Sequence, residues 1–553
     1  MRVSDGRREA LGDIESQVAA ALSGAGAYAV LFAGAIGLLL TLYFPALQGE
    51  FVADDHPYIL GNLQIHELDL ETLAQLVNPW SELSANVANW APIHMLLHAL
   101  EWQAFGSAVF GYHVVQIVVH ALGSVLLVAL FRHWGLSALA SLFGGLLFLV
   151  HPANVEAVAW MSQLKTTGAL VFAVGALILQ RERPLLALLC FALALLTKAL
   201  AIFALPAAVT VLIVRSGTRR EWIWIAGWIG FFLFYLAPQF AAFQRVGEAA
   251  LPLHPDPLVA ARTIPAIAAR YVAMGLTSLG VSAFQDTPRA LGWLDPWWLA
   301  GSIGIAAFGI RAVLSLVRKR DEAIYWAWLV TAWLPIAQFF PFNYVMADRY
   351  LYFPLPALIG LVLVAGGDAI HRLPASRRRG VSLGALALGV ALLVGFAARL
   401  PARAGVWRSE ATLTMDSVRH SPDGVPAQLQ KARTAAAHGD RDGVVRALEK
   451  LHERGFRKFD AITANPVFQP YISDPGFQKA LGAILRDSIQ GLEAIAAPNQ
   501  AELRGIAMGY LALGELDRAA LYFERAIDYG GPLDGHLKRQ LTELQQLRRQ
   551  PRP

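Results

Sequence analysis

The chain has 553 residues, of which 56% are hydrophobic and only 16% are charged. Soluble domains carry charge on about a quarter of their residues, so this composition excludes a purely soluble enzyme and a disordered chain. Basic residues exceed acidic ones by only five charges, and a single cysteine, Cys190, excludes an intrachain disulfide.

The charged residues are unevenly distributed. Residues 402–553 contain 39 Asp, Glu, Lys or Arg in 152 positions, as a soluble domain would, whereas the first 401 residues contain only 48. The sequence therefore predicts an all-α fold with three parts. These are a polar cytoplasmic tail over 1–26, a polytopic membrane domain over 27–402, and an α-helical outer domain over 403–553.

Twelve apolar segments follow the polar tail. The first is long enough to cross a hydrocarbon core of ~30 Å and too long for a cleavable signal, so we expect a retained anchor. The segments are 27–47, 109–131, 136–151, 164–181, 184–198, 199–215, 222–244, 258–282, 297–317, 323–342, 347–367 and 380–400.

Clusters of basic residues between the segments predict the orientation. These clusters face the cytoplasm under the positive-inside rule, and about eleven spans satisfy the rule if 258–282 does not fully cross. Prolines favour a re-entrant or interfacial element there, and a twelfth span is the alternative. The N terminus is then cytoplasmic, and everything after Leu400 is outside. The prolines are Pro252, Pro255, Pro257 and Pro265, and the basic clusters are Arg132, Arg181 and Arg183, Arg215 to Arg220, Arg318 to Arg320, and Arg372 to Arg379.

This topology gathers five polar stretches on the outer side of the membrane. They carry nearly all of the chain's unusual polar residues, which points to a reaction at that face with a lipid-borne partner. The stretches are the first outer loop over 48–108, then 151–164, 197–198, 245–296 and 343–352.

Two adjacent carboxylates, Asp54 and Asp55, stand near the start of the first outer loop. Carboxylates at a membrane surface are costly unless they are solvated, paired or used. A charged neighbour can raise the pKa of one of them toward the range of a general base that deprotonates a hydroxyl. A solvated acidic loop or a helix N-cap before Pro57 is the structural alternative. The sequence does not decide which of the two is the base.

Three basic residues, Lys165, Lys198 and Arg349, lie at the outer ends of apolar segments. Cations at that end oppose the positive-inside bias, so we expect them to bind an anion such as a phosphate or diphosphate group. The alternatives are lysines that reach back to water and, for Arg349, an ion pair with Asp348.

Histidines and a further carboxylate accompany this site. Glu156 is placed to orient His151 or a sugar hydroxyl. His94 and His98 stand one helical turn apart, as in some zinc sites, but without an HExxH pattern, and packed histidines are the commoner outcome. No cofactor is predicted, and a divalent metal ion at the acidic pair stays open.

Several motifs follow one another along the chain. They are Phe51-x-x-Asp54-Asp55 with Asn62, Ala91-Pro92, Phe110-x-Tyr112-His113, His151-Pro152-x-x-x-Glu156-Ala157-Val158, Lys165, and Ala347-Asp348-Arg349-Tyr350-x-Tyr352. In this order, they resemble the transmembrane and tetratricopeptide-repeat family of protein O-mannosyltransferases, as a short bacterial-type member. More loosely they resemble the GT-C fold of glycosyltransferases. The likeness covers essentially the whole chain and rests on the order of the motifs rather than on any single one.

The resemblance implies transfer of a sugar, with mannose as one candidate, from a polyprenyl-phosphate donor to a protein hydroxyl. Transfer would occur with inversion at the outer face of a bacterial inner membrane. The implied residues are Asp54 and Asp55 for catalysis, Lys165, Lys198 and Arg349 for the donor phosphate, and His151, Glu156, Asp348 and Tyr350 in support. The chain departs from the family at Lys198-Ala199, where Lys-Glu is common, and at Lys165-Thr166, where an Arg-x-Asp or Lys-Asp unit is common.

The C-terminal region carries a tetratricopeptide-like pattern. Small and large residues predict paired helices over about 501–513 and 515–529, and a degraded copy runs over 429–455. Fewer than three clear repeats are marginal for a free-standing array, so we expect this periplasmic region to lean on the outer loops and to hold an acceptor or partner. A structural cap is the alternative.

Two rival functions stay open. A non-enzymatic transporter of a lipid-linked sugar would place polar residues along the full depth of its spans, whereas here they gather at one face. An enzyme that transfers sugar to a lipid or polysaccharide would use a similar site, and the repeat region favours a protein acceptor. Nucleic acid is not an expected partner, because the basic residues sit in short clusters between apolar segments.

Overall fold

The computed structural model describes residues 9–81, 83–84, 89–246, 253–254, 256–339, 344–531 and 533–549. Within these ranges the regular structure is helical and no strand occurs, which confirms the all-α prediction. Two prolines named in the sequence predictions, Pro252 and Pro255, and the first residue of the stretch 343–352 lie outside the described residues.

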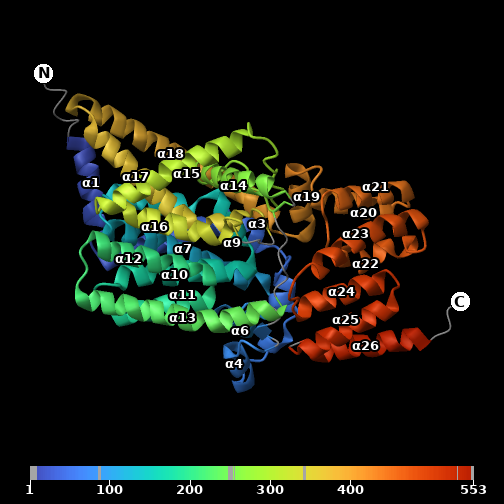
Figure 1. Ribbon diagram of the computed structural model, residues 1–553. Helices are drawn as coiled ribbons and strands as arrows, with labels where there is room; N and C mark the ends of the chain where they lie inside the picture. Colours follow the sequence, from blue (N-terminus) through green and yellow to red (C-terminus); the bar gives the residue numbers. More distant parts are fainter. Residues whose placement is uncertain are drawn as a thin grey trace.

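A bundle of helices forms the N-terminal three quarters of the chain (Figure 1). It comprises α1 (Glu9–Ala21), α2 (Ala25–Leu42), α3 (Phe44–Leu47), α7 (Val109–His133), α8 (Ala138–Leu149), α9 (Val155–Ala159), α10 (Leu164–Leu179), α11 (Pro184–Thr197), α12 (Ala204–Val214), α13 (Arg219–Val246), α14 (Pro257–Thr277), α15 (Pro296–Val317), α16 (Glu322–Trp333), α17 (Pro354–Arg372) and α18 (Ala375–Val406). The predicted first outer loop holds η1 (His56–Leu60), η2 (Leu63–Ile65), α4 (Leu70–Val77) and α6 (Pro92–Phe105). Short 3-10 turns are η3 (Pro152–Asn154), η4 (Met161–Gln163), η5 (Ala199–Phe203), η6 (Leu334–Ile336) and η7 (Asp348–Leu351).

Seven helices in the described part of the chain are long and apolar enough to cross a membrane, as in a multi-pass membrane protein. An eighth span results if α8 and the segment Pro152–Ala159, which meet at a 48° bend, count as one. Others of the predicted spans correspond to shorter apolar helices, α11 and α12, which pack against α10 and α16. Their 14 and 11 residues are too few to cross alone at 1.5 Å per residue.

Segment 258–282 forms α14, which is not among those seven helices. The helix begins at Pro257, where the side chain of Asp256 accepts a hydrogen bond from the Leu258 amide at 2.8 Å, and it continues through Pro265. Arg262 is buried and donates to the carbonyl oxygens of residues 290 and 291. The guanidinium is thus satisfied within the chain itself.

The segment predicted at 347–367 begins its helix later than expected. Residues 348–351 form the 3-10 turn η7, and α17 starts only at Pro354, whose fixed φ suits the first turn of a helix. Asp348 and Arg349 therefore lie on a short irregular stretch in front of α17 rather than inside a span.

The C-terminal helices stack in a row beside one end of the bundle, where α3, α6 and α9 lie and opposite the end occupied by α1 (Figure 1). They are α19 (Glu410–His420), α20 (Val425–Ala437), α21 (Arg441–Glu453), α22 (Asp460–Thr463), η8 (Pro466–Tyr471), α23 (Pro475–Glu493), α24 (Gln500–Ala512), α25 (Leu516–Tyr529) and α26 (Asp534–Arg549). Helices α24 and α25 coincide with the pair predicted from the small and large residues. Their buried faces share a core of Ala507, Ala519 and Phe523.

The row of C-terminal helices contacts the predicted outer loops, as expected for an array with fewer than three clear repeats. Asp416 on α19 accepts from the Ala283 amide at 2.9 Å and from Arg403 at 2.8 Å. Arg454 lies 3.3 Å from the carboxylate of Asp286. These contacts fix α19 and the end of α21 against residues 283–286, in what we call the 280s loop.

Gly301 on α15 provides a test of how closely α14 and α15 pack together. A Cβ added there would lie 1.9 Å from the carbonyl oxygen of Pro265 on α14, so Gly301→Ala must push the two helices apart. We expect the variant to lower the melting temperature in detergent by several degrees, as overpacking costs about 1–3 kcal/mol. Gly309→Ala on the same helix is the control, because nothing lies within 4 Å of its Cβ. Equal melting temperatures for the two variants would contradict this packing.

Candidate active site

The two adjacent carboxylates of the first outer loop have different surroundings. Asp55 is fully buried: one of its oxygens accepts from the Val52 amide at 3.0 Å, and the other accepts from the amide of Ser162 at 2.7 Å and from its hydroxyl. Burial raises the pKa of the Asp55 carboxyl from 3.8 to about 7, and the hydrogen bonds from Ser162 and Val52 oppose that rise. Asp55 thus ties the loop to the start of α10.

Asp54 is half-buried, and its carboxylate makes no hydrogen bond or ion pair within the described residues. It acts electrostatically on Lys165 and on Tyr58, which places it beside the predicted cations. Of the two acids, Asp54 is the one whose carboxylate oxygens have no partner among the described residues.

The lysines Lys165 and Lys198 stand at neighbouring ends of α10 and α11, which pack along each other. Both are half-buried. Lys165 lies with its ammonium 4.5 Å from the ring centre of Tyr58, and Lys198 donates a 2.7 Å hydrogen bond to the hydroxyl of Thr166. In the part of the chain that is described, neither lysine forms an ion pair with a carboxylate. Both amino groups are therefore without an anionic partner in those described ranges.

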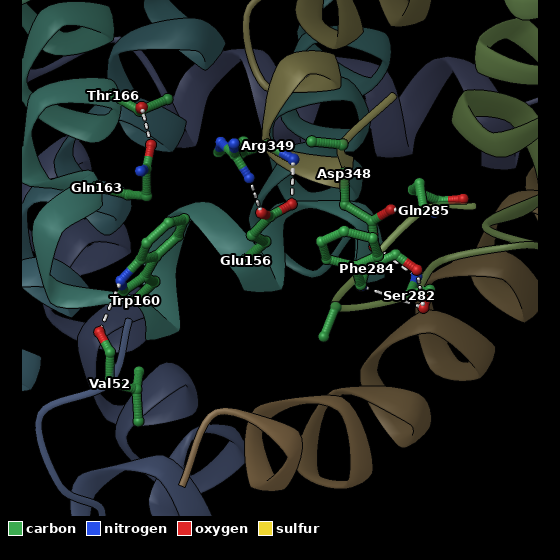
Figure 2. A network of polar contacts seen from close by, with 12 residues as sticks. Val52, Glu156, Trp160, Gln163, Thr166, Ser282, Phe284, Gln285, Asp348 and Arg349 are labelled. Carbon is green, nitrogen blue, oxygen red and sulfur yellow. Dashed lines mark hydrogen bonds and ion pairs between the residues drawn. The ribbon is translucent and has the colours of Figure 1, made fainter. Parts of the chain in front are cut away.

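Arg349 pairs with Glu156 rather than with the adjacent Asp348, as Figure 2 shows. One oxygen of Glu156 accepts from the guanidinium, and the other accepts from the backbone amide of Arg349 at 2.7 Å. The guanidinium carbon also lies 4.8–5.2 Å from the ring centres of Trp160, Tyr344 and Tyr350. This framework fixes the direction of Arg349 and balances its charge.

Asp348 faces away from this pair, toward the 280s loop (Figure 2). Its carboxylate accepts from the Ser282 amide at 2.8 Å and from the Gln285 side chain at 2.6 Å. Burial and the nearby charge of Glu156 hold the pKa of Asp348 well above its ordinary value. The expected alternative of an Asp348–Arg349 ion pair is therefore wrong in this structure.

His151 does not contact Glu156, so the predicted orientation of one by the other is not found. Its Nδ1 accepts from the Ala153 amide at 3.2 Å, and its Nε2 donates to the carbonyl of Gly275 at 3.2 Å. The ring is buried against Phe396. This histidine joins helices and holds the start of η3.

His94 and His98 lie on α6 with ring centres 4.6 Å apart. His98 shares a 2.7 Å hydrogen bond with Glu101 through Nδ1, and both rings are buried. Across the described ranges, no group of three or more His, Cys, Asp or Glu side chains is arranged to hold a metal ion. The geometry therefore shows packed histidines at this position.

The structure brings six of the predicted residues into one cluster, with Glu156 paired to Arg349 and close enough to act electrostatically on Lys198. Lys165 interacts electrostatically with Asp54, Asp55 and Arg349, and Lys198 interacts with Lys165 and Arg349. Several contact residues were not predicted, because their roles arise from helix packing and no spacing in the sequence marks them. They are Tyr58, Ser162, Thr166 and Tyr344, together with Trp160, which the sequence shows only as one of fifteen tryptophans.

The pKa of Asp55 predicts a pH dependence of stability. The folded protein holds the proton of this carboxyl more tightly than the unfolded chain does. Its contribution to the free energy of unfolding is therefore fully present below pH 3.8 and is lost as the pH rises through about 7. Thermal unfolding in detergent from pH 4 to 8 measures it. We expect the melting temperature of the wild type to fall over this range relative to Asp55→Asn, which has no carboxyl to titrate at this position. Parallel curves for the two proteins would contradict the assignment.

Segments of the chain are similar to known protein O-mannosyl-transferases. Identity is 33% over 132 residues with protein O-mannosyl-transferase Tmtc1 of Drosophila melanogaster, covering 23% of this chain and 15% of that protein. It is 30% over 154 residues with human protein O-mannosyl-transferase TMTC4, covering 24% and 20%. With protein O-mannosyl-transferase F38B6.6 of Caenorhabditis elegans it is 27% over 189 residues, covering 32% and 27%.

No protein-family model and no solved structure matches the chain. The matched segments span between 15% and 27% of the length of these three relatives. The comparisons bear out the resemblance drawn from the motifs: this chain is similar, over part of its length, to the transmembrane and tetratricopeptide-repeat protein O-mannosyl-transferases.

Proposed function

We propose that this chain is a glycosyltransferase that moves a sugar from a polyprenyl-phosphate donor to a hydroxyl of a protein. Mannose is the first sugar to test, because the relatives are named for it. The reaction takes place at the outer face of a bacterial inner membrane. In that arrangement the N terminus is cytoplasmic, a GT-C-like membrane domain spans 27–402, and a tetratricopeptide-like periplasmic region follows over 403–553.

One arrangement carries the proposal: Lys165 and Lys198 are half-buried and have no carboxylate partner among the described residues. Lys165 stands beside Asp54, whose carboxylate also has no partner in those ranges. An uncompensated charge is expensive near the membrane, so Lys165 and Lys198 fit an anionic ligand far better than an apolar one. Both lie at the ends of apolar helices, where the phosphate of a membrane-anchored donor would be. The adjacent acid suits proton transfer.

In the proposed reaction, Asp54 takes the proton of the acceptor hydroxyl, and the oxygen of that hydroxyl attacks the anomeric carbon of the sugar. The bond between that carbon and the phosphate oxygen breaks, and its electron pair leaves with the polyprenyl phosphate. Negative charge develops on the departing phosphate, where preformed cations lower the barrier most. A single displacement of this kind inverts the anomeric carbon.

The cations take different parts in this scheme. Lys165 and Lys198 supply the net positive charge for the phosphate. Glu156 already balances the charge of Arg349, so this arginine contributes directed hydrogen-bond donors rather than net charge. Asp55 holds the loop that carries Asp54, and Asp348, Tyr350 and His151 support the surrounding backbone and rings.

The test is Asp54→Asn in cells that lack the native gene, with hexose-sized mass increments on envelope proteins and glycolipids as the readout. We expect the wild type to restore the increment on proteins and Asp54→Asn to lower it by about 10²–10⁴-fold, the usual loss when a general base is removed. Glu71→Gln, an exposed acid in the same loop, is the matched control and should behave as the wild type.

Normal transfer by folded Asp54→Asn would contradict the assignment of the base. An increment confined to glycolipids or polysaccharide would show that the acceptor is not protein. Equal increments with and without the gene would overturn the proposed activity itself.

A further inference from the structure

The segment that joins the last bundle helix to the C-terminal row touches the candidate active site twice. We call Trp407 to Glu410 the junction segment; it follows α18 and ends on the first residue of α19. One end of it holds the loop with Asp54, and the other packs on the ring beneath Arg349. Neither contact was anticipated from the sequence.

Three hydrogen bonds, each donated by a backbone amide, fix the junction segment to the acidic loop. The Glu50 amide donates to the carbonyl of Arg408 at 3.0 Å, and the Glu410 amide donates to the carboxylate of Glu50 at 3.2 Å. The Ala53 amide donates to the carboxylate of Glu410 at 2.5 Å. Ala53 and Glu410, which this last hydrogen bond joins, are 357 positions apart in the sequence.

The approach of the two backbones is close. A Cβ on Gly49 would lie 2.9 Å from the carbonyl oxygen of Arg408 and 2.9 Å from that of Ala46. Only glycine fits there without displacing one of the two backbones.

Ala53 adopts a conformation that alanine rarely takes. Its φ is +48°, in the left-handed region where a Cβ collides with backbone, and such residues persist only where their surroundings hold them. The carboxylate of Glu410 accepts the amide hydrogen of this residue. Asp54 follows directly, so the direction of its carboxylate depends on the backbone of Ala53.

The other end of the junction segment reaches the arginine. Trp407 is buried and stacks on Trp160, with ring centres 5.3 Å apart and planes inclined by 22°. Trp160 donates from its indole nitrogen to the Val52 carbonyl at 3.2 Å and lies 5.2 Å from the guanidinium of Arg349 (Figure 2). The same short segment therefore supports both sides of the cluster.

We propose that Glu410 is a positioning residue for Asp54, acting through the Ala53 amide, and that the junction segment couples the C-terminal helices to the reacting groups. This inference rests on the proposed function for its effect on turnover. Its structural part, that Glu410 holds the acidic loop, stands separately. A partner that moves α19 would thereby move the base.

The variants are Glu410→Ala, which removes the acceptor, and Glu410→Gln, whose amide oxygen can still accept the Ala53 hydrogen. Glu453→Ala, an exposed glutamate at the far end of α21, is the control. The full-length protein is purified in detergent and given synthetic polyprenyl-phosphate mannose, with envelope proteins from cells lacking the gene as acceptor. Hydrogen exchange of the peptide over residues 51–58 is followed in parallel.

We expect Glu410→Ala to lower kcat by about 10- to 100-fold with little change in the KM for the donor, because a misdirected base slows the chemical step. Hydrogen exchange of 51–58 should rise in the same variant. Glu410→Gln should keep most of the wild-type rate and protection. Adding Ala53→Gly to Glu410→Ala should recover part of the rate, because glycine adopts a φ of +48° without steric cost.

Wild-type exchange and rate in Glu410→Ala, with Asp54→Asn inactive, would overturn the positioning role and leave the proposed function intact. Raised exchange in Glu410→Ala, with Asp54→Asn fully active, would instead remove Asp54 as the base while the structural contact stands. Equal losses in Glu410→Ala and Glu410→Gln would also reject the hydrogen bond as the cause.

Discussion

The ion pair between Glu156 and Arg349 is the interaction on which the candidate site depends. Its carboxylate binds both the guanidinium and the backbone amide of the arginine, so it fixes the short turn before α17 against α9. Breaking such a buried pair typically costs about 3–5 kcal/mol, because one charge is left without a partner. With this charge balanced, Lys165 and Lys198 are the basic residues of the cluster that have no carboxylate partner among the described residues.

The two neighbouring aspartates show how surroundings separate identical side chains. Both carboxylate oxygens of Asp55 accept hydrogen bonds, one from Val52 and the other from Ser162, and the side chain is fully buried. Asp54, one residue on the N-terminal side, is half-buried, and its carboxylate has no partner in the described part of the chain. The buried acid therefore holds the loop, and its neighbour is the one whose carboxylate can meet a ligand.

Much of the fold follows from patterns that the sequence displays directly. Apolar length predicts α7, α15 and α18, and small-to-large packing predicts the pair α24 and α25. The number of long spans is harder to predict, because α11 and α12 look like spans in composition yet have too few residues to cross alone.

The site was predictable in its charged residues but not in their pairing. Motif order indicated Asp54, Lys165 and Arg349, and Lys198 was predicted from its place at the outer end of an apolar segment; the structure brings these residues together. The partner of Arg349 is Glu156, 193 positions away, and the partner of Ala53 is Glu410, 357 positions away. Contacts of that range come from packing, which no local spacing records.

In the proposed reaction, Lys165 and Lys198 hold the donor phosphate beside Asp54. A cryo-electron microscopy structure of the full chain with polyprenyl phosphate tests this arrangement. We expect phosphate density bridging the two amino groups, with the Asp54 carboxylate facing the open side of that phosphate. Density for the phosphate elsewhere, with the two lysines unoccupied, would contradict it.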